Sequence, residues 1–547
     1  MGGEYPIRIQ SMINSPTMNT KACVDQCKQL MDAGADYVRI TTPSIKDAEN
    51  LIYIKKILRD SGYGKPLIAD VHFNPAVAEV AARLVEKVRI NPGNYLDKKR
   101  FEQIDLSESE YNLELEIIHE RVLPLLLICK QYGTAVRIGV NHGSLSDRIM
   151  SRYGDTPEGM VESAMEFLRI FVSEGFHQTI ISMKSSNTRV MVHSTRLLVK
   201  KMQEEDMNYP VHLGVTEAGE GEDGIIKSAT GIGTLLSEGI GETIRVSLTG
   251  DPLQEIPAAK EIVGYFNQRQ GHAPITVYTD KHSHVLYRRR NSIPFGKIGG
   301  NQPVVIVNSD LPVTTLQKED ICMSGMSPEH FKQIGITSVT KVSMDDTGIK
   351  DKVFVVTSEH IHFDGEIRAT LDGLEKKQIP NPVIIHRVYQ EPSLYRLQIM
   401  AACDFGPLLI DGTLDGIWIE NKERTIEPVR IYQLTLNLLQ ATRIRMSKTE
   451  YISCPSCGRT LFDLTTTLQK IRNETSHLKH LKIGVMGCIV NGPGEMADAD
   501  YGYVGSGLGK ITLYRNKVVI RKNIPEEIAV SELITLIKQN NDWLEPN

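Results

Sequence analysis

The sequence is poor in cysteine, with eight cysteines among 547 residues. That density is too low for a disulfide-stapled secreted fold. No run of eighteen apolar residues occurs, so no transmembrane helix is predicted. The first residues, MGGEYPIRIQSM, contain no basic segment followed by an apolar stretch, so no secretory signal is expected. These absences together predict a protein of the cytoplasm.

The sequence also has no excess of positive charge. Its 62 lysine and arginine residues are outnumbered by 67 aspartate and glutamate residues, which gives a net charge of −5. Nucleic-acid-binding proteins are more often basic, so nucleic acid is not an expected partner. Hydrophobic residues make up 41% of the chain and charged residues 24%, as in ordinary globular proteins. The length predicts two to four domains.

The first part of the chain alternates short β-branched runs with amphipathic segments whose apolar residues have helical spacing. The runs are 7–12, 37–42, 67–73, 87–94, 135–141, 179–184, 211–217 and 243–248. Eight strands alternating with helices within about 250 residues predict a (β/α)8 TIM barrel. A doubly wound open sheet is the alternative, but eight units fit a closed barrel better.

Two further domains are expected after a catalytic barrel over residues 1–255. Residues 256–430 mix strands and helices in a middle α/β domain, and residues 431–547 form a C-terminal α+β domain. The middle segment shows no clustering of polar residues at the ends of its predicted strands. This favours a spacer or partner-facing domain over a second active site.

Basic residues occupy predicted barrel strands, where apolar side chains are usual. They are Arg39, Arg89, Arg137 and Arg245 inside four strands, and Lys184 at the end of a fifth. Active sites of TIM barrels lie at the carboxyl ends of the strands, so these cations are expected to converge there. Arginine binds phosphate through two parallel hydrogen bonds, so the pattern predicts a doubly phosphorylated ligand. Internal salt bridges at the barrel rim are the alternative.

Other polar residues of the same strands extend this candidate site. Because side chains alternate along a strand, some share a face with the arginines: Asn91, Asn141 and Ser247. Only two carboxylates near strand ends are visible to balance the cations: Asp70 and Glu217. His72 and His142 follow strands directly, and for them a site role and a structural role are about equally supported.

Three cysteines crowd into the C-terminal part of the chain. Cys454 and Cys457 form a C-x2-C pair, and Cys488 follows 31 residues after it, one ligand short of a four-thiolate site. The candidates for a fourth ligand are Glu495, His477 and His480. Zinc accepts three cysteines and a histidine, whereas an iron–sulfur cluster with one weak ligand suits direct chemistry on a substrate. The glycines around Cys488 favour close approach of a bulky cofactor, and hence a cluster over zinc.

A series of motifs resembles one known family. The motifs are IQSM, VRITTP, ADVHF, RINPGN, RIGVNHGSLSDRIM, SMKSSN, HLGVTEAGEGEDG and TIRVSLT, followed by CPSCGR and GVMGCIVNGPGE. In this order they are similar to the 4-hydroxy-3-methylbut-2-enyl diphosphate synthases of the methylerythritol phosphate route to isoprenoids. The resemblance covers the barrel and the C-terminal domain. The insertion at about 256–430 resembles the three-domain form of plants and some bacteria, in which the middle domain is barrel-like.

The resemblance implies an oxidoreductase that opens the ring of 2-C-methyl-D-erythritol 2,4-cyclodiphosphate with loss of water. It implies one [4Fe–4S] cluster held by Cys454, Cys457, Cys488 and Glu495. The implied diphosphate-binding residues are Arg39, Arg89, Asn91, Arg137, Asn141, Lys184, Arg245 and Ser247. Glu217 matches the family's acid, and Asp70 and His72 match a further pair near the substrate.

The electrons are then expected from ferredoxin or flavodoxin, because no flavin or nicotinamide site is visible in the sequence. A homodimer is compatible with this family, and a plant source would place the chain in the plastid stroma. The competing hypothesis from another class is a phosphate-binding barrel with a structural zinc domain, acting as a non-redox lyase or a binding module.

Overall fold

A computed structural model describes residues 2–95, 103–275, 286–323, 336–339, 352–489, 492–496 and 498–546. Only the backbone is described for residues 336–339, Pro493 and Glu495. The chain divides into two compact units. The first comprises Met1–Ser228, Ile240–Lys260 and Lys448–Asn547, and the second Ala229–Gly239 and Glu261–Ser447. The three-domain boundaries stay a prediction. Within the described ranges, no helix is long and apolar enough to cross a membrane.

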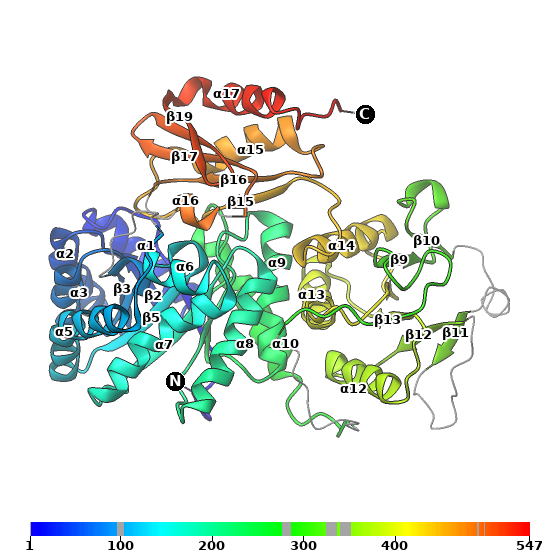
Figure 1. Cartoon of the computed structure of the whole chain (residues 1–547), viewed down its shortest axis with the longest axis horizontal. Helices are drawn as coiled ribbons and strands as arrows, with labels where there is room; N and C mark the ends of the chain where they lie inside the picture. Colours follow the sequence, from blue (N-terminus) through cyan, green and yellow to red (C-terminus); the bar gives the residue numbers. More distant parts are fainter. Residues whose placement is uncertain are drawn as a thin grey trace. The chain divides into compact units, whose positions relative to one another are not determined.

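The first unit contains the predicted TIM barrel, which is confirmed (Figure 1). Its strands are β1 (Arg8–Met12), β2 (Tyr37–Thr41), β3 (Leu67–Asp70), β4 (Lys87–Ile90), β5 (Ala135–Asn141), β6 (Thr179–Lys184), β7 (His212–Leu213) and β8 (Thr243–Ile244). All paired neighbours are parallel, in the order β6-β5-β4-β3-β2-β1-β8-β7. A bridge between Ile181 and Val211 joins the two ends of this order and nearly closes the barrel.

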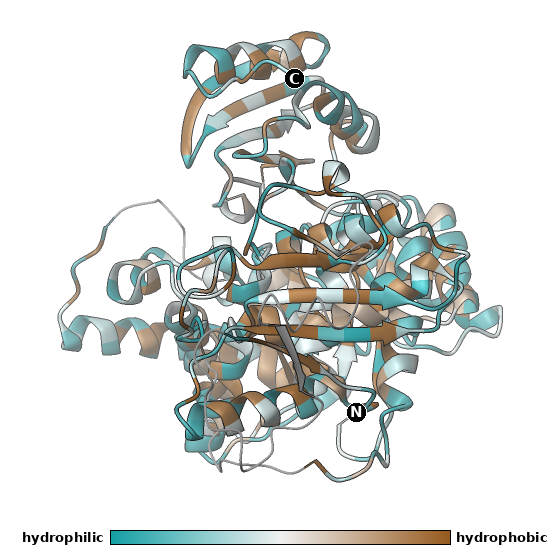
Figure 2. Cartoon of the chain, turned by 90° about the vertical axis from the view of Figure 1, so that its right-hand side faces the viewer, coloured by the Kyte–Doolittle hydropathy of each residue, from teal (hydrophilic) through white to brown (hydrophobic). Residues whose placement is uncertain are grey.

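Helices follow the strands around the barrel. They are α1 (Thr20–Ala33), α2 (Ile45–Asp60), α3 (Pro75–Ala82), α4 (Pro92–Tyr95), α5 (Glu108–Tyr132), α6 (Asp147–Tyr153), α7 (Pro157–Ser173), α8 (Thr188–Glu204), α9 (Gly221–Ser237) and α10 (Glu255–Asn267). Polar residues cap several starts: Ser44 accepts a hydrogen bond from the backbone N–H of Asp47 in a capping box. Across the chain, Figure 2 shows much hydrophobic colour, with some polar positions, on the strands turned toward the viewer, and alternating colours on the helices, as amphipathic packing requires.

Several strands are shorter than predicted. The ladders of β7 and β8 contain two residues each, against predictions of 211–217 and 243–248. After β7 the backbone leaves extended geometry, with φ of +156° at Gly214 and +47° at Glu217. These short ladders leave residues after β7 and β8 free to turn toward the barrel mouth.

The C-terminal part of the first unit is a five-stranded sheet. Its strands are β15 (Glu450–Ser453), β16 (Lys482–Met486), β17 (Tyr501–Gly507), β18 (Lys510–Arg515) and β19 (Val518–Pro525), paired in chain order. The first three are parallel and the last two pairings are antiparallel. The helices are α15 (Leu464–Thr475), α16 (Gly492–Glu495) and α17 (Glu526–Gln539). Buried residues of α15, α17 and the sheet form one core, among them Leu468, Ile483 and Leu533.

The sequence pattern does not predict β17, because glycines interrupt it at Gly502, Gly505 and Gly507. The structure shows why two of them are small. A Cβ at Gly502 would lie 2.3 Å from Sδ of Met496, and one at Gly505 would lie 2.6 Å from the carbonyl oxygen of Gly487. The strand therefore allows the Cys488 segment to pack directly against it.

The second unit contains a six-stranded, all-parallel sheet. Its strands are β9 (Val305–Asn308), β10 (Ile321–Cys322), β11 (Ile336–Val339), β12 (Val353–Thr357), β13 (Val383–Tyr389) and β14 (Gly416–Asn421), in the order β10-β9-β14-β13-β12-β11. Its helices include α12 (Phe363–Lys376), α13 (Leu394–Asp411) and α14 (Pro428–Ala441). This sheet agrees with the predicted α/β character of the middle segment.

The expectation that this segment lacks polar clustering at strand ends is wrong. His386 on β13 lies 3.0 Å from Oγ1 of Thr357 on β12 and 3.0 Å from Oε2 of Glu420 on β14. Ser309, just after β9, donates a hydrogen bond of 2.9 Å to the same carboxylate. These residues are far apart in sequence, so only the parallel order of the strands reveals the cluster. Its hydrogen bonds are satisfied internally, as in a structural network.

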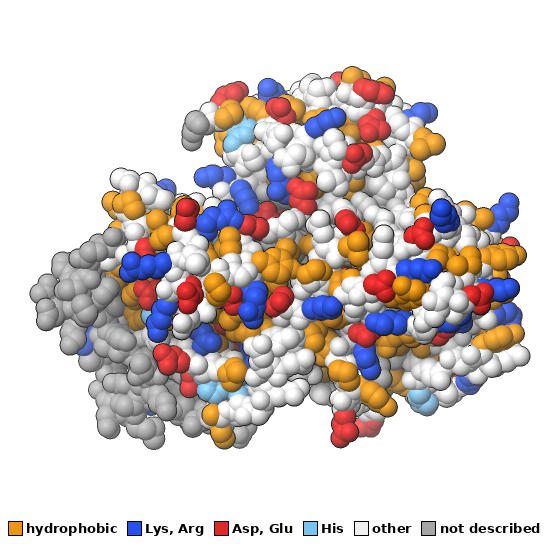
Figure 3. Space-filling view, turned by 180° about the vertical axis from the view of Figure 1, so that it is seen from behind, with side chains coloured by type: hydrophobic (Ala, Val, Ile, Leu, Met, Phe, Trp, Pro, Cys, Tyr) orange, Lys and Arg blue, Asp and Glu red, His pale blue; other side chains and the backbone are white. Residues whose placement is uncertain are grey.

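The surface carries both signs of charge. Figure 3 shows one face on which basic and acidic side chains are interspersed with apolar ones. This mixture agrees with the small net charge of −5.

Candidate active site

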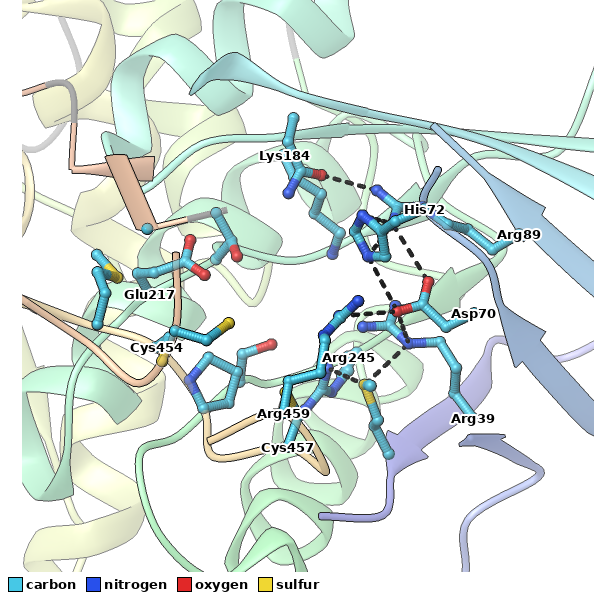
Figure 4. Close-up of a pocket in the computed structure, with 18 of the residues that line it drawn as sticks. Arg39, Asp70, His72, Arg89, Lys184, Glu217, Arg245, Cys454, Cys457 and Arg459 are labelled. Carbon is cyan, nitrogen blue, oxygen red and sulfur yellow. Dashed lines mark hydrogen bonds and ion pairs between the residues drawn. The ribbon is translucent and has the colours of Figure 1, made fainter. Parts of the chain in front are cut away.

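One pocket of the first unit is lined by the barrel mouth and by the cysteine loops of the same chain (Figure 4). The predicted site residues that line it are Arg39, Asp70, His72, Arg89, Arg137, Asn141, Lys184, Glu217, Arg245, Ser247, Cys454, Cys457 and Cys488. Asn91 is completely buried but does not line the pocket, and its side-chain amide has no hydrogen-bond partner among the described residues. The side chain of Glu495 lies outside the described residues.

Alternation along the strands aims the cations into the barrel. The guanidinium of Arg89 on β4 crosses to β5, where it donates a hydrogen bond of 2.8 Å to the carbonyl of Gly139. A Cβ at Gly139 would lie 2.5 Å from Nε of Arg89, so glycine is required for this approach. Likewise, a Cβ at Gly214 would lie 2.3 Å from Nζ of Lys184. Two glycines therefore make room for two cations.

Two carboxylates neutralise part of this charge. Asp70 lies 3.2 Å from Arg89 and 3.9 Å from Arg39, and Arg459 of the cysteine loop approaches it to 3.8 Å. Glu255 at the start of α10 holds Arg245 with two hydrogen bonds, of 2.9 and 3.1 Å. Arg39, Arg89 and Arg245 are thus anchored by carboxylates at the sides of the pocket.

Arg137 has no such anchor. Its side chain is 1% exposed and donates a hydrogen bond of 3.3 Å to Oγ of Ser182, and it forms no ion pair within the described part of the chain. A buried arginine without a carboxylate is costly unless an anion completes the site. This arrangement favours a bound anion over the alternative of a fully salt-bridged barrel rim.

The pKa values reflect the crowding of positive charge. Burial, reinforced by Arg39 and Arg89, lowers the pKa of Arg137 well below its ordinary value. Burial and Arg137 likewise lower the pKa of Lys184, and burial lowers the pKa of Arg39 to about 10. For Asp70, burial acts to raise the pKa, but Arg39, His72 and Arg89 together hold it well below its usual range. An anion in the pocket relieves this repulsion among the cations.

His72 is part of the anchored side of the pocket. Arg89 donates a hydrogen bond of 2.8 Å to its Nε2, and burial lowers the pKa of the imidazole to about 3. His72 is therefore neutral near pH 7. His142, the other histidine considered from the sequence, pairs with Asp155 at 2.9 Å and is not among the residues lining the pocket.

Glu217 lies where the barrel meets the cysteine segment. It is 3% exposed and has a φ of +47°, a strained conformation of the kind that clusters at functional sites. Its neighbour Ala218 forms a parallel β-bridge with Ser453, the residue before Cys454. Thr249, after β8, lies 2.8 Å from Oγ of Ser453. These contacts hold the Cys454 loop against the mouth of the barrel.

The three cysteines enter the pocket from two loops. Cys454 and Cys457 follow β15, and Cys488 follows β16. The backbone N–H of Gly487 donates to Sγ of Cys454 at 3.3 Å, a contact that stabilises a thiolate. Burial lowers the pKa of Arg459, but Cys457 and Asp70 more than offset this and the net shift is upward. Burial raises the pKa of the Cys454 thiol well above its ordinary value, against the effect of the Gly487 N–H. The loop thus places a lasting positive charge beside the thiols.

The residues fit a cluster better than a single zinc ion. Cysteine thiolates are the ligands that hold iron–sulfur clusters, and three cysteines line this pocket. The alternative histidine ligands are engaged elsewhere: His477 contacts the carbonyl of Leu544 at 2.7 Å, and His480 that of Asp542 at 3.0 Å.

Sequence reasoning missed several residues of this pocket: Met12, Thr216, Arg459 and Met486 line it, and Glu255 anchors it from below. Arg459 could have been found, since it stands two residues after the second cysteine in CPSCGR. Glu255 lies beyond the last predicted strand and gives no local signal.

The comparisons with known proteins agree with this geometry. Residues 1–260 match the family model of the GcpE TIM-barrel domain, and residues 450–539 match that of the GcpE protein C-terminal domain. The 4-hydroxy-3-methylbut-2-en-1-yl diphosphate synthase (flavodoxin) of Phocaeicola vulgatus is 49% identical, over 100% of this chain and 97% of that protein. The synthase of the same name from Porphyromonas gingivalis is 46% identical, over 100% and 96% of the two chains.

Solved structures add little. A dihydropteroate synthase from Xanthomonas albilineans covers 50% of this chain with 13% identity and a TM-score of 0.32, a likeness too low to support an inference. The sequence relatives are decisive, because they match over their full length and at nearly half of all positions. The chain belongs to the GcpE family, the 4-hydroxy-3-methylbut-2-en-1-yl diphosphate synthases.

Proposed function

We propose that the chain reduces 2-C-methyl-D-erythritol 2,4-cyclodiphosphate to (E)-4-hydroxy-3-methylbut-2-enyl diphosphate, opening the ring and releasing one water. The observation that supports this most is the pocket itself. Buried cations suited to a diphosphate face three cysteines suited to a redox cluster, all within one chain. The names of the full-length relatives state the same product.

We assign one [4Fe–4S] cluster to Cys454, Cys457 and Cys488, with Glu495 as the fourth ligand. The three thiols lining the pocket and the Gly487 N–H to Cys454 support this assignment. Glu495 is assigned from the family resemblance alone, since its side chain is not described. When bound, the cluster supplies electrons one at a time to the substrate.

The cations of the barrel bind and orient the diphosphate. Arg137 is the strongest candidate for a phosphate contact, because it is buried and forms no ion pair with the described residues. Arg245 is held by Glu255 and presents a fixed guanidinium to the ligand. Charge that develops on the diphosphate as the ring opens is stabilised by donors already in position.

Glu217 is the proposed acid. Its side chain lines the pocket together with the barrel cations and Cys454, and its carboxyl group donates a proton to the departing hydroxyl, which leaves as water. The low exposure of Glu217 and the cysteine loops over the barrel mouth exclude bulk water from this transfer.

The proposed electron donor is flavodoxin, because the relatives carry that donor in their names. Ferredoxin, the other donor expected from the sequence, is the alternative. The cytoplasmic location and the homodimer expected from the sequence stay predictions.

A colour test separates the redox proposal from the zinc alternative. Protein purified without oxygen is expected to be brown, to absorb near ~400 nm as thiolate–iron clusters do, and to turn over the cyclic diphosphate with an artificial reductant. A colourless protein with one equivalent of zinc and no turnover would overturn the redox proposal.

We also propose that one chain completes its own active site. The β-bridge from Ala218 to Ser453 and the buried ion pair of 2.9 Å between Lys227 and Glu450 join the barrel to the cysteine segment of the same chain. Co-expression of Glu217→Ala with Cys488→Ser is therefore expected to give no more turnover than either variant alone.

The control is co-expression of wild type with Cys488→Ser, which should keep the turnover of its wild-type chains. Substantial recovery of turnover in the doubly mutant mixture would show that sites are shared between chains.

A further inference from the structure

A polar layer lies inside the barrel, below the pocket. TIM-barrel interiors are usually filled by branched apolar side chains. Here Lys87 begins β4 and shares its face with Arg89, so it lies one step deeper in the barrel than that pocket residue. Gln10 on β1 and His212 on β7 are also buried, each 1% exposed. None of these three residues has a role in the proposed reaction.

Lys87 is the most unusual member of this layer. Its side chain is 4% exposed, and its Nζ has no hydrogen-bond partner among the described residues. The ammonium group lies 4.4 Å from the ring centroid of Tyr37 on β2, which offers an aromatic face but no negative charge. Burying a lysine without a carboxylate partner destabilises the fold, because an apolar side chain of similar size would fill the same space without the desolvation penalty of a charge.

The charged groups around Lys87 are mostly cations. The positive charges of Arg137 on β5 and Arg39 on β2 lower the pKa of Lys87. The charges of Lys87 and Lys184 in turn contribute to lowering the pKa of His212. Burial, followed by Arg137 and Arg39, lowers the pKa of Lys87 to about 7. Near neutral pH the charge of this lysine therefore depends on whether an anion occupies the pocket above it.

We propose that Lys87 is a positioning residue for the substrate, a second-layer cation that gains a proton when the diphosphate binds above it and strengthens the hold of Arg89 and Arg137 on that anion. This inference rests on the proposed function for the identity of the diphosphate. Lys87 touches no reacting atom, so it acts through the first layer of cations.

The direction of the pH effect follows from linkage. An anion above Lys87 favours its charged form and raises its pKa in the complex. At pH 6 the lysine is protonated with or without ligand, so binding takes up no proton there. At pH 8 it is mostly neutral in the free protein and protonated in the complex, so binding takes up a proton. Affinity therefore falls as the pH rises above about 7.

Isothermal titration in two buffers of different ionisation enthalpy measures this proton uptake directly. The probes are the cyclic diphosphate and inorganic pyrophosphate, titrated into wild type, Lys87→Met and the exposed-lysine control Lys46→Met at pH 6 and pH 8. At pH 8, Lys87→Met is expected to lose most of the uptake and to bind about tenfold more weakly. Its kcat at saturating substrate should stay within about twofold of wild type, with the loss in KM.

The inference would be overturned if Lys87→Met took up as many protons and bound the diphosphate as tightly as wild type at pH 8. A lower kcat with unchanged KM in this variant would also overturn it. Lys87→Gln provides a second, smaller neutral side chain in case methionine disturbs packing on Tyr37. If wild type takes up a proton on binding pyrophosphate, Lys87→Met loses that uptake, and the cyclic diphosphate does not bind, the proposed substrate is contradicted while the role of Lys87 is still supported.

Discussion

Each of the variants Cys454→Ser, Cys457→Ser and Cys488→Ser is expected to lose the iron–sulfur cluster and, with it, all turnover. Serine is a poor ligand for iron in such clusters, and the structure offers no spare thiol near the pocket within the described residues. Iron and sulfide content and the absorbance near ~400 nm of anaerobically purified protein measure the loss. The fold should survive, because these side chains are only partly buried.

Two further variants sharpen this test. Cys322→Ser is the matched control, since Cys322 is also partly exposed and its Sγ donates to the carbonyl of Leu311, a bond that serine can replace. It should keep iron and turnover. Glu495→Ala should keep much of the iron and lose most turnover, because a carboxylate ligand is the exchangeable one. Full iron content in Cys488→Ser, or full activity in Glu495→Ala, would contradict the ligand assignment.

The barrel could be predicted from sequence because its signals are local. Eight β-branched runs, each followed by an amphipathic segment, are enough to indicate alternating strands and helices. The strand cations were informative for the same reason: an arginine such as Arg137 within an apolar run is anomalous wherever the strand lies. The ends of β7 and β8 were not predictable, because φ values at Gly214 and Glu217 depend on the packing at the barrel mouth.

The sequence does not predict which distant residues form ion pairs or hydrogen bonds with the residues of the site. Glu255 neutralises Arg245 from the start of a helix, and Arg459 reaches Asp70 from a loop hundreds of residues away. Neither pairing has a periodicity or a spacing that marks it. The hydrogen-bonded cluster of Thr357, His386 and Glu420 was not predicted for the same reason, since each residue alone is an ordinary strand residue.

These partners change the interpretation of the cation cluster. The sequence predicts only that the cations converge at the carboxyl ends of the strands, and the structure divides them into two groups. Arg245 and Arg89 are anchored by carboxylates, whereas Arg137 and Lys184 are buried among other cations. The anchored residues shape the pocket in the absence of ligand, and the unanchored ones depend on the ligand for their counter-charge. The largest loss of substrate binding is therefore expected at the second group.

Arg137→Ala is accordingly expected to lower kcat/KM for the cyclic diphosphate by ~10²-fold or more, since truncating a desolvated charge-assisted pair costs roughly 2–5 kcal/mol. Arg245→Ala should also lose activity, but part of its effect comes from leaving Glu255 buried without its cation. Steady-state kinetics with an artificial reductant, together with the absorbance near ~400 nm, separate weak binding from cluster loss.

Arg169→Ala is the matched control, because Arg169 is 39% exposed on α7 and pairs with Glu162 and Glu205 outside the pocket. Removing a partly exposed pair of this kind costs little stability, about 1 kcal/mol or less, and should leave kcat/KM near wild type. Arg137→Ala should also unfold no more easily than wild type, because it removes a buried charge that lacks a carboxylate. Unchanged kinetics in both Arg137→Ala and Arg245→Ala would place the anion outside the barrel mouth. If Arg137→Ala instead keeps its stability and its full iron–sulfur cluster content but binds the substrate more weakly, the arginine serves ligand binding at the expense of stability.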